Sequence, residues 1–186
     1  MAAKKQFTST KKEKNMIPQI KKILYATDLS KNSAYAFFYA MDMAQRHQAS
    51  IVLLHAIKPI YPSEYSGEGF MFEDIMEVQK RERKADIVEL KKNIQAFCQK
   101  TEAQMGSSCA HRVTEILVPI GHPVEEILKA VDEESCDAIV LGTHSKGFLK
   151  HTFLGSVASS VLERTRKPVF IIPLPSDKTS IEWAKI

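Results

Sequence analysis

The 186-residue sequence lacks a long apolar run and has no apolar segment near its start. A membrane-spanning helix needs about 20 consecutive apolar residues, so the sequence argues against an integral membrane protein. A secretory signal needs an apolar stretch behind a basic start. The opening residues MAAKKQFTSTKKEKN do not provide one. We therefore expect a cytoplasmic protein without a membrane partner.

Cysteines are few. Cys98, Cys109 and Cys136 are an odd number without Cys-x-x-Cys spacing. Disulfide frameworks and zinc sites use paired, regularly spaced cysteines, so this pattern favours reduced thiols. Cys98 shares an apolar helical stripe with Leu90 and Ile94, which predicts a place in the core.

The motifs of common catalytic and phosphate-binding sites are also absent. The sequence shows no His-Glu-x-x-His, no paired carboxylates, no Ser-His-Asp order and no Gly-x-Gly-x-x-Gly. Gly142 and Gly147 have the glycine spacing of a P-loop, but Phe148 and Leu149 stand where lysine and serine or threonine are required. We therefore assign no catalytic residue and no metal ligand set.

The composition that remains is typical of a globular domain, with 44% hydrophobic and 26% charged residues. Five lysines and one glutamate give residues 1–16 a net charge of +4, which is the net charge of the whole chain. We expect a basic, disordered arm at 1–16 and a C-terminal extension at 176–186. A basic arm can contact nucleic acid, but no nucleic-acid-binding module follows it, so we expect no such partner.

Hydrophobic periodicity predicts five strands alternating with four helices over residues 17–175. Apolar runs predict strands at 22–26, 50–56, 111–120, 137–141 and 169–172. Three- and four-residue spacing predicts helices at about 31–47, 73–105, 123–131 and 156–165. Residues 58–72, rich in proline, glycine and aromatic residues, predict a loop or lid. The pattern predicts one α/β domain with a mainly parallel sheet and helices on both faces.

In such sheets ligands bind at the carboxyl ends of the strands, where the strand order reverses. The loop after the fourth strand contains Gly142, and Gly155-Ser156 opens a helix whose amide groups favour a phosphate. Lys146 adds positive charge. The glycine spacing alone fits a strand-end turn and an N-cap equally well.

The loops after the first two strands carry the other candidate residues. The Asp28 carboxylate can accept a ribose hydroxyl or help to hold a divalent cation beside phosphates. It can also cap the helix that begins near Ser30. Small and apolar residues at 55–57 suit an adenine slot, and His55 fits a structural role as well as a ligand contact.

Several spaced motifs together resemble the universal stress protein family. They are ILYATDLS at 23–30, LLHAI at 53–57, GHPVEEI at 121–127, DAIVLGTHS at 137–145, LGSV at 154–157 and KPVFIIP at 167–173. The resemblance covers residues 18–173 and implies an open, five-stranded, Rossmann-like α/β fold. It also implies a homodimer formed through the last strand, Val169, Phe170, Ile171 and Ile172.

ATP-binding members of that family carry the loop pattern G-x2-G-x9-G-[ST]. This sequence keeps the spacing but has Ser145 in place of the second glycine. If that position requires a positive φ, serine costs about 1–2 kcal/mol. The resemblance implies adenosine contacts at Ala26, Thr27, Asp28 and Ala56. It implies ribose and phosphate contacts at Leu141, Gly142, Thr143, His144, Ser145, Lys146, Gly155, Ser156 and Val157.

Three functional hypotheses follow. The main one is a stress regulator that binds ATP or AMP, with Mg²⁺ held through the nucleotide phosphates near Asp28. The second is a dimeric interaction protein of the same fold that has lost nucleotide binding, as Ser145 indicates. The third is a weak ATPase.

Overall fold

The computed structural model describes residues 18–59, 72–105, 111–143 and 154–173. The predicted arm at 1–16, most of the predicted loop at 58–72 and the predicted extension at 176–186 lie outside these ranges. The domain limits 17–175 therefore stay a prediction.

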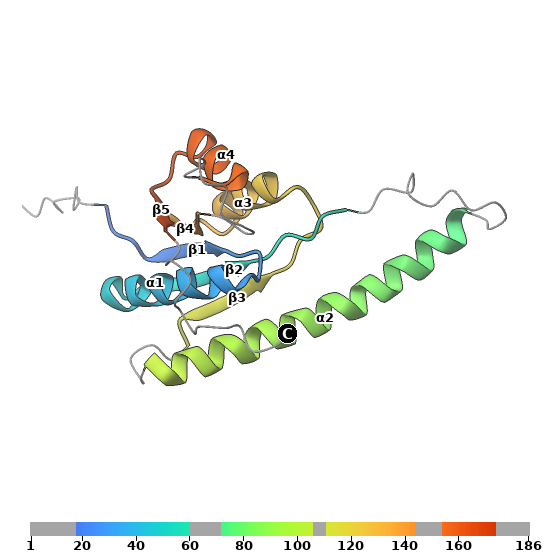
Figure 1. The fold of residues 1–186 in the computed structure, drawn as a ribbon, viewed down its shortest axis with the longest axis horizontal. Helices are drawn as coiled ribbons and strands as arrows, with labels where there is room; N and C mark the ends of the chain where they lie inside the picture. Colours follow the sequence, from blue (N-terminus) through green and yellow to red (C-terminus); the bar gives the residue numbers. More distant parts are fainter. Residues whose placement is uncertain (1–17, 60–71, 106–110, 144–153, 174–186) are drawn as a thin grey trace, which may run out of the picture.

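Five strands form one sheet in the order β3-β2-β1-β4-β5 (Figure 1). Their bounds are β1 Lys22–Ala26, β2 Ser50–Leu54, β3 Val113–Leu117, β4 Ala138–Gly142 and β5 Val169–Ile172. Each neighbouring pair is parallel, which confirms the predicted sheet. The second and third strands are shorter than predicted.

The four predicted helices are present in the described part of the chain. They are α1 Lys31–His47, α2 Phe72–Met105, α3 Pro123–Glu133 and α4 Ser156–Arg164. Helices α1 and α2 pack on one face of the sheet, and α3 and α4 pack on the other. The structure therefore confirms an α/β fold with helices on both faces.

Side-chain alternation along the central strands builds a core on each face. In β1, Ile23 and Tyr25 join the core under α1 and α2, whereas Leu24 and Ala26 join the core under α3 and α4. Successive side chains of a strand point to opposite faces. A strand buried on both faces is therefore apolar throughout, which is why these strands were evident as continuous runs.

The edge strand β3 departs from simple alternation. Its pairing with β2 shifts register between Ile51 and Val52, so Val113 and Ile116 pack on the first face and Leu117 on the second. The extra residue of a bulge reverses the alternation that follows it. Val113 and Leu117 therefore face opposite sides of the sheet, although four residues separate them.

Among the described side chains of helix α2, those that pack on the sheet lie from Ile87 onward. Ile94 and Cys98 are buried, and the Phe97 ring lies 5.7 Å from that of Phe37. Upstream, Val88 is 67% exposed, and Figure 1 shows the helix continuing past the sheet. The predicted core position of Cys98 is confirmed, and burial raises the pKa of its thiol to about 12.

None of the helices in the described ranges is both long and apolar enough to cross a membrane.

Two substitutions on α2 test where this helix packs. Ile94→Ala removes a fully buried side chain and should cost about 3 kcal/mol of unfolding free energy. Val88→Ala, on the exposed part of the same helix, should change it by less than about 0.5 kcal/mol. Urea denaturation of both variants measures the difference. Comparable losses would contradict the one-sided packing.

Candidate functional site

A cavity of about 320 Å³ opens at the carboxyl ends of β1, β2 and β4. Its volume is within the usual range for small-molecule sites. The sheet order explains its place, because β1 leads to β2 on one side while the chain returns to β4 on the other. The crevice therefore lies at the point where the strand order reverses.

Ten of the thirteen predicted contact residues line this one cavity. They are Ala26, Thr27, Asp28, Ala56, Leu141, Gly142, Thr143, Gly155, Ser156 and Val157. The other three, His144, Ser145 and Lys146, lie outside the described residues. The structure thus brings together three loops far apart in sequence, while the role of each residue in binding stays a prediction.

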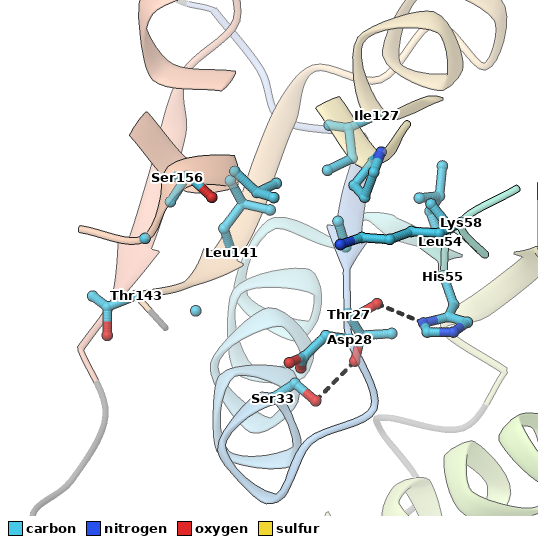
Figure 2. Close-up of a pocket in the computed structure, with 17 residues that line it drawn as sticks. Thr27, Asp28, Ser33, Leu54, His55, Lys58, Ile127, Leu141, Thr143 and Ser156 are labelled. Atoms are coloured by element: carbon cyan, nitrogen blue, oxygen red, sulfur yellow. Dashed lines mark hydrogen bonds between the residues drawn. The ribbon is translucent and has the colours of Figure 1, made fainter. Parts of the chain in front are cut away.

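Seven further residues line the cavity, and of these only His55 was considered as a ligand contact from the sequence. They are Ser33, Leu54, His55, Lys58, Pro123, Ile127 and Ala158. Figure 2 shows Ser156 and Thr143 on one side of the cavity and His55 and Lys58 on the other. Ile127 follows from the apolar stripe of its helix, but nothing in the sequence placed that stripe over the strand ends.

Hydrogen bonds fix the turn between β1 and α1. The Thr27 hydroxyl donates to Ser33 Oγ at 2.9 Å and accepts the Leu29 amide at 3.0 Å. Ser30 is the N-cap of α1, and its hydroxyl accepts the Ser33 amide. Asp28 accepts the Ser30 amide at 3.1 Å instead of capping the helix, and it lines the cavity.

His55 joins the ends of two strands. Its Nδ1 lies 2.9 Å from the Thr27 carbonyl oxygen, and the Thr27 amide donates to the Leu54 carbonyl (Figure 2). Because a carbonyl oxygen only accepts, Nδ1 carries the proton of this bond. The structural role that the sequence left open is therefore present, and the ring also borders the cavity.

The chain after β2 continues as part of the cavity wall. Ile57 forms a parallel bridge with Ile120, and its amide donates to the Pro119 carbonyl at 2.8 Å. The Gly121 amide donates back to the Ile57 carbonyl at 2.9 Å. These bonds hold Lys58 beside the start of α3, whose Pro123 and Ile127 give the cavity an apolar side.

The start of α4 lines the opposite side of the cavity with backbone amides in place of apolar side chains. Gly155 is the N-cap, with φ −70° and ψ 158°, and it makes no side-chain capping bond. Its own amide donates to the Thr143 carbonyl at 2.7 Å, which ties α4 to the end of β4. The first-turn amides of Ser156 and Val157 thus lie at the cavity, where the helix dipole favours an anion.

Charged side chains are sparse in the cavity. Among the lining residues, Asp28 is the only carboxylate and Lys58 the only lysine or arginine. Within the described ranges, no group of three histidine, cysteine, aspartate or glutamate residues is placed to hold a metal ion. A cation beside Asp28 would therefore take further ligands from a bound molecule.

The parallel sheet, its reversed strand order and the crevice at the strand ends define an open α/β protein with a cavity at the switch point. The universal stress protein family model matches residues 19–173. The chain belongs to the universal stress protein family, which confirms the resemblance drawn from its motifs.

Curated relatives share most of their length with this chain. The universal stress protein MJ0577 of Methanocaldococcus jannaschii is 31% identical, over 82% of this chain and 94% of its own. A universal stress protein of Thermus aquaticus is 32% identical, over 82% of this chain and 98% of its own.

Solved structures show the same fold. The structure of MJ0577 matches with a TM-score of 0.62 at 29% identity, covering 84% of this chain and 98% of that one. UspA of Lactobacillus plantarum matches with a TM-score of 0.62 at 21% identity, covering 83% and 98%. A universal stress protein solved in complex with cAMP has a TM-score of 0.51 at 20% identity, covering 83% and 98%.

The hydrogen bonds of Thr27 should contribute to stability. Thr27→Val keeps the shape of a buried side chain but leaves the Leu29 amide without its side-chain acceptor. We expect a loss of about 2 kcal/mol of unfolding free energy. Thr114→Val is the matched control, because the hydroxyl of exposed Thr114 makes only one 3.4 Å bond on the edge strand. Chemical denaturation measures the loss of unfolding free energy in both variants. A larger loss for Thr114→Val than for Thr27→Val would contradict the stabilising role of Thr27.

Proposed function

We propose that this protein binds an adenine nucleotide, ATP or AMP, in the switch-point cavity and acts as a nucleotide-responsive stress regulator. The observation that carries the proposal is the convergence of ten predicted contact residues on one cavity. The apolar wall, the single carboxylate and the helix N-terminus there match the three chemical parts of a nucleotide.

Each part of the cavity suits one part of that ligand. Ala56, Pro123 and Ile127 offer an apolar slot for a flat base. The Asp28 carboxylate can accept hydrogen bonds from ribose hydroxyls, because it is an acceptor when ionised. The Ser156 hydroxyl and the first-turn amides of α4 can donate to phosphate oxygens.

Mg²⁺ fits the same arrangement as a companion of the nucleotide. It keeps several waters and binds through one or two carboxylates together with substrate phosphates. Asp28 would supply the one carboxylate, and the phosphates would supply further oxygens. The residues present thus suit metal binding only together with the ligand.

The family relationship supports the nucleotide class of this proposal. A universal stress protein of the same fold has been solved in complex with the nucleotide cAMP. We propose no catalytic residue, and a weak ATPase remains an alternative without a specific observation in its favour. The cytoplasmic location stays a prediction.

We also propose a homodimer formed through β5. This strand lies at the edge of the sheet, paired with β4 on one side only. Phe170 on it is 36% exposed. An open edge with an exposed aromatic residue favours pairing with another chain. The same open edge also supports the second hypothesis. In it the protein is a dimeric interaction protein of the same fold, and nucleotide binding has been lost because Ser145 replaces the second glycine of the loop pattern.

A pair of substitutions at Ser156 tests the phosphate end of the site. Ser156→Ala removes the hydroxyl, and Ser156→Pro removes both the hydroxyl and the amide hydrogen. Proline is tolerated at this first helical position, and the extended Gly155 suits a residue before proline. We expect Ser156→Pro to weaken ATP binding about tenfold more than Ser156→Ala does.

Isothermal titration with ATP–Mg²⁺ and with AMP measures both effects, and thermal unfolding confirms that each variant is folded. If neither ligand binds the unchanged protein at millimolar concentration, the nucleotide proposal fails. The interaction hypothesis then becomes the better one. If the two Ser156 variants bind ATP with equal affinity, the Ser156 amide does not contribute to ATP binding.

The proposed dimer is tested at Phe170. Lysine on an edge strand opposes pairing with another chain, so Phe170→Lys should convert a dimer into a monomer. Leu162→Lys, at a 48% exposed position on α4, is the matched control and should leave the dimer intact. Light scattering after size exclusion gives the mass. A monomeric unchanged protein, or a dimeric Phe170→Lys variant, would refute the β5 interface.

A further inference from the structure

We propose that Lys58 is a specificity-determining residue of the cavity, selecting phosphorylated ligands over uncharged nucleosides. Its ammonium group would pair with a phosphate oxygen from the side opposite α4. This inference rests on the proposed nucleotide function and names the chemical feature by which the site chooses its ligand.

The backbone around Lys58 is held in place. Ile57, the residue before it, is bonded on both sides, its amide to Pro119 and its carbonyl to the Gly121 amide. Pro59, the residue after it, restricts Lys58 to extended conformations. The Lys58 Cα therefore has a fixed position at the cavity mouth, close to the start of α3.

The side chain of Lys58 is directed into the cavity. Residues 56 and 58 both line it, as expected for alternate positions of an extended chain. Figure 2 shows the Lys58 side chain lying across the cavity, with its nitrogen end toward the side of Leu141 and Ser156. Its aliphatic part can thus cover a bound ligand while its charge reaches inward.

The charge of Lys58 has no counter-ion in the described structure. None of the ion pairs between described residues involves Lys58. In particular, Lys58 does not pair with Asp28, the other charged side chain among the described lining residues. On the opposite side, the α4 amides also present positive charge. A ligand phosphate is the group that both sides can satisfy together.

The selection follows from what each ligand offers. A nucleoside fills the apolar slot and reaches Asp28, but it offers the solvent-exposed Lys58 no anionic group. A nucleotide makes the same contacts and adds an ion pair in a partly enclosed site. Such a pair, strengthened by a charge-assisted hydrogen bond, should favour AMP over adenosine by about five- to tenfold.

The test compares AMP and adenosine in metal-free buffer by isothermal titration, so that Mg²⁺ does not contribute. Lys58→Met keeps the length and apolar stem of the side chain and removes its charge. Lys58→Arg keeps the charge. Lys91→Met, at an exposed position on α2, makes the same change in net charge away from the cavity.

We expect Lys58→Met to weaken AMP binding about five- to tenfold and to leave adenosine binding within about twofold. Lys58→Arg and Lys91→Met should keep the AMP preference of the unchanged protein. The AMP affinity of Lys58→Met should also depend less on salt concentration, because one ion pair fewer is screened. Where adenosine binds too weakly to titrate, this salt dependence decides.

Three results would overturn the inference while leaving the proposed function intact. The first is that Lys58→Met weakens AMP and adenosine binding equally, which would mean that the side chain acts through packing. The second is that Lys58→Met has no effect on AMP binding. The third is that Lys91→Met weakens AMP binding as much as Lys58→Met does. If the unchanged protein binds neither AMP nor ATP, the proposed function and this inference fall together.

Discussion

The pairing of β1 with β4 is the constraint on which the site depends. Ile23, Leu24 and Tyr25 pair with Ala138, Ile139 and Val140, so two strands far apart in sequence become neighbours at the centre of the sheet. From β1 the chain leaves toward β2, and from β4 it leaves toward β5. The loops that follow must separate, and the cavity is the space between them. The pairing that buries both faces of these strands therefore stabilises the fold and creates the candidate binding crevice at the same time.

Short hydroxyl side chains and backbone amides shape the polar part of this crevice. The turn after β1 uses the hydroxyls of Thr27, Ser30 and Ser33 to satisfy local donors, which leaves the Asp28 carboxylate at the cavity. At α4, a glycine N-cap leaves the first-turn amides without a side-chain acceptor. Among the described residues of the cavity only Asp28 and Lys58 carry a full charge, so we expect each of them to influence which ligands bind.

The sequence predicted the fold well because strands buried on both faces appear as apolar runs, as at 50–54. It left Asp28 open between a ligand contact and the cap of α1, since aspartate forms N-caps readily and only the backbone path, which puts Ser30 at the cap, decides. The sequence did not reveal the bulge in β3, because its extra residue, Thr114, suits a strand and leaves the strand pattern at 113–117 unbroken. Lys58 was missed because it was assigned to a loop, although its spacing of two from Ala56 on an extended chain was a usable signal.

In the proposed complex, Ser145 and Lys58 would both act on the phosphate end of the ligand, each from its own loop. If serine at the second glycine position costs about 1–2 kcal/mol in the phosphate loop, the affinity for phosphate falls by that amount. An ammonium group paired with the same phosphate returns about 1 kcal/mol. Effects from separate elements that share no direct contact add approximately. If both residues act as proposed, the departure from the family loop pattern and the charge of Lys58 have effects of opposite sign and similar size, so Ser145 alone is a poor reason to assign this chain to a non-binding branch of its family.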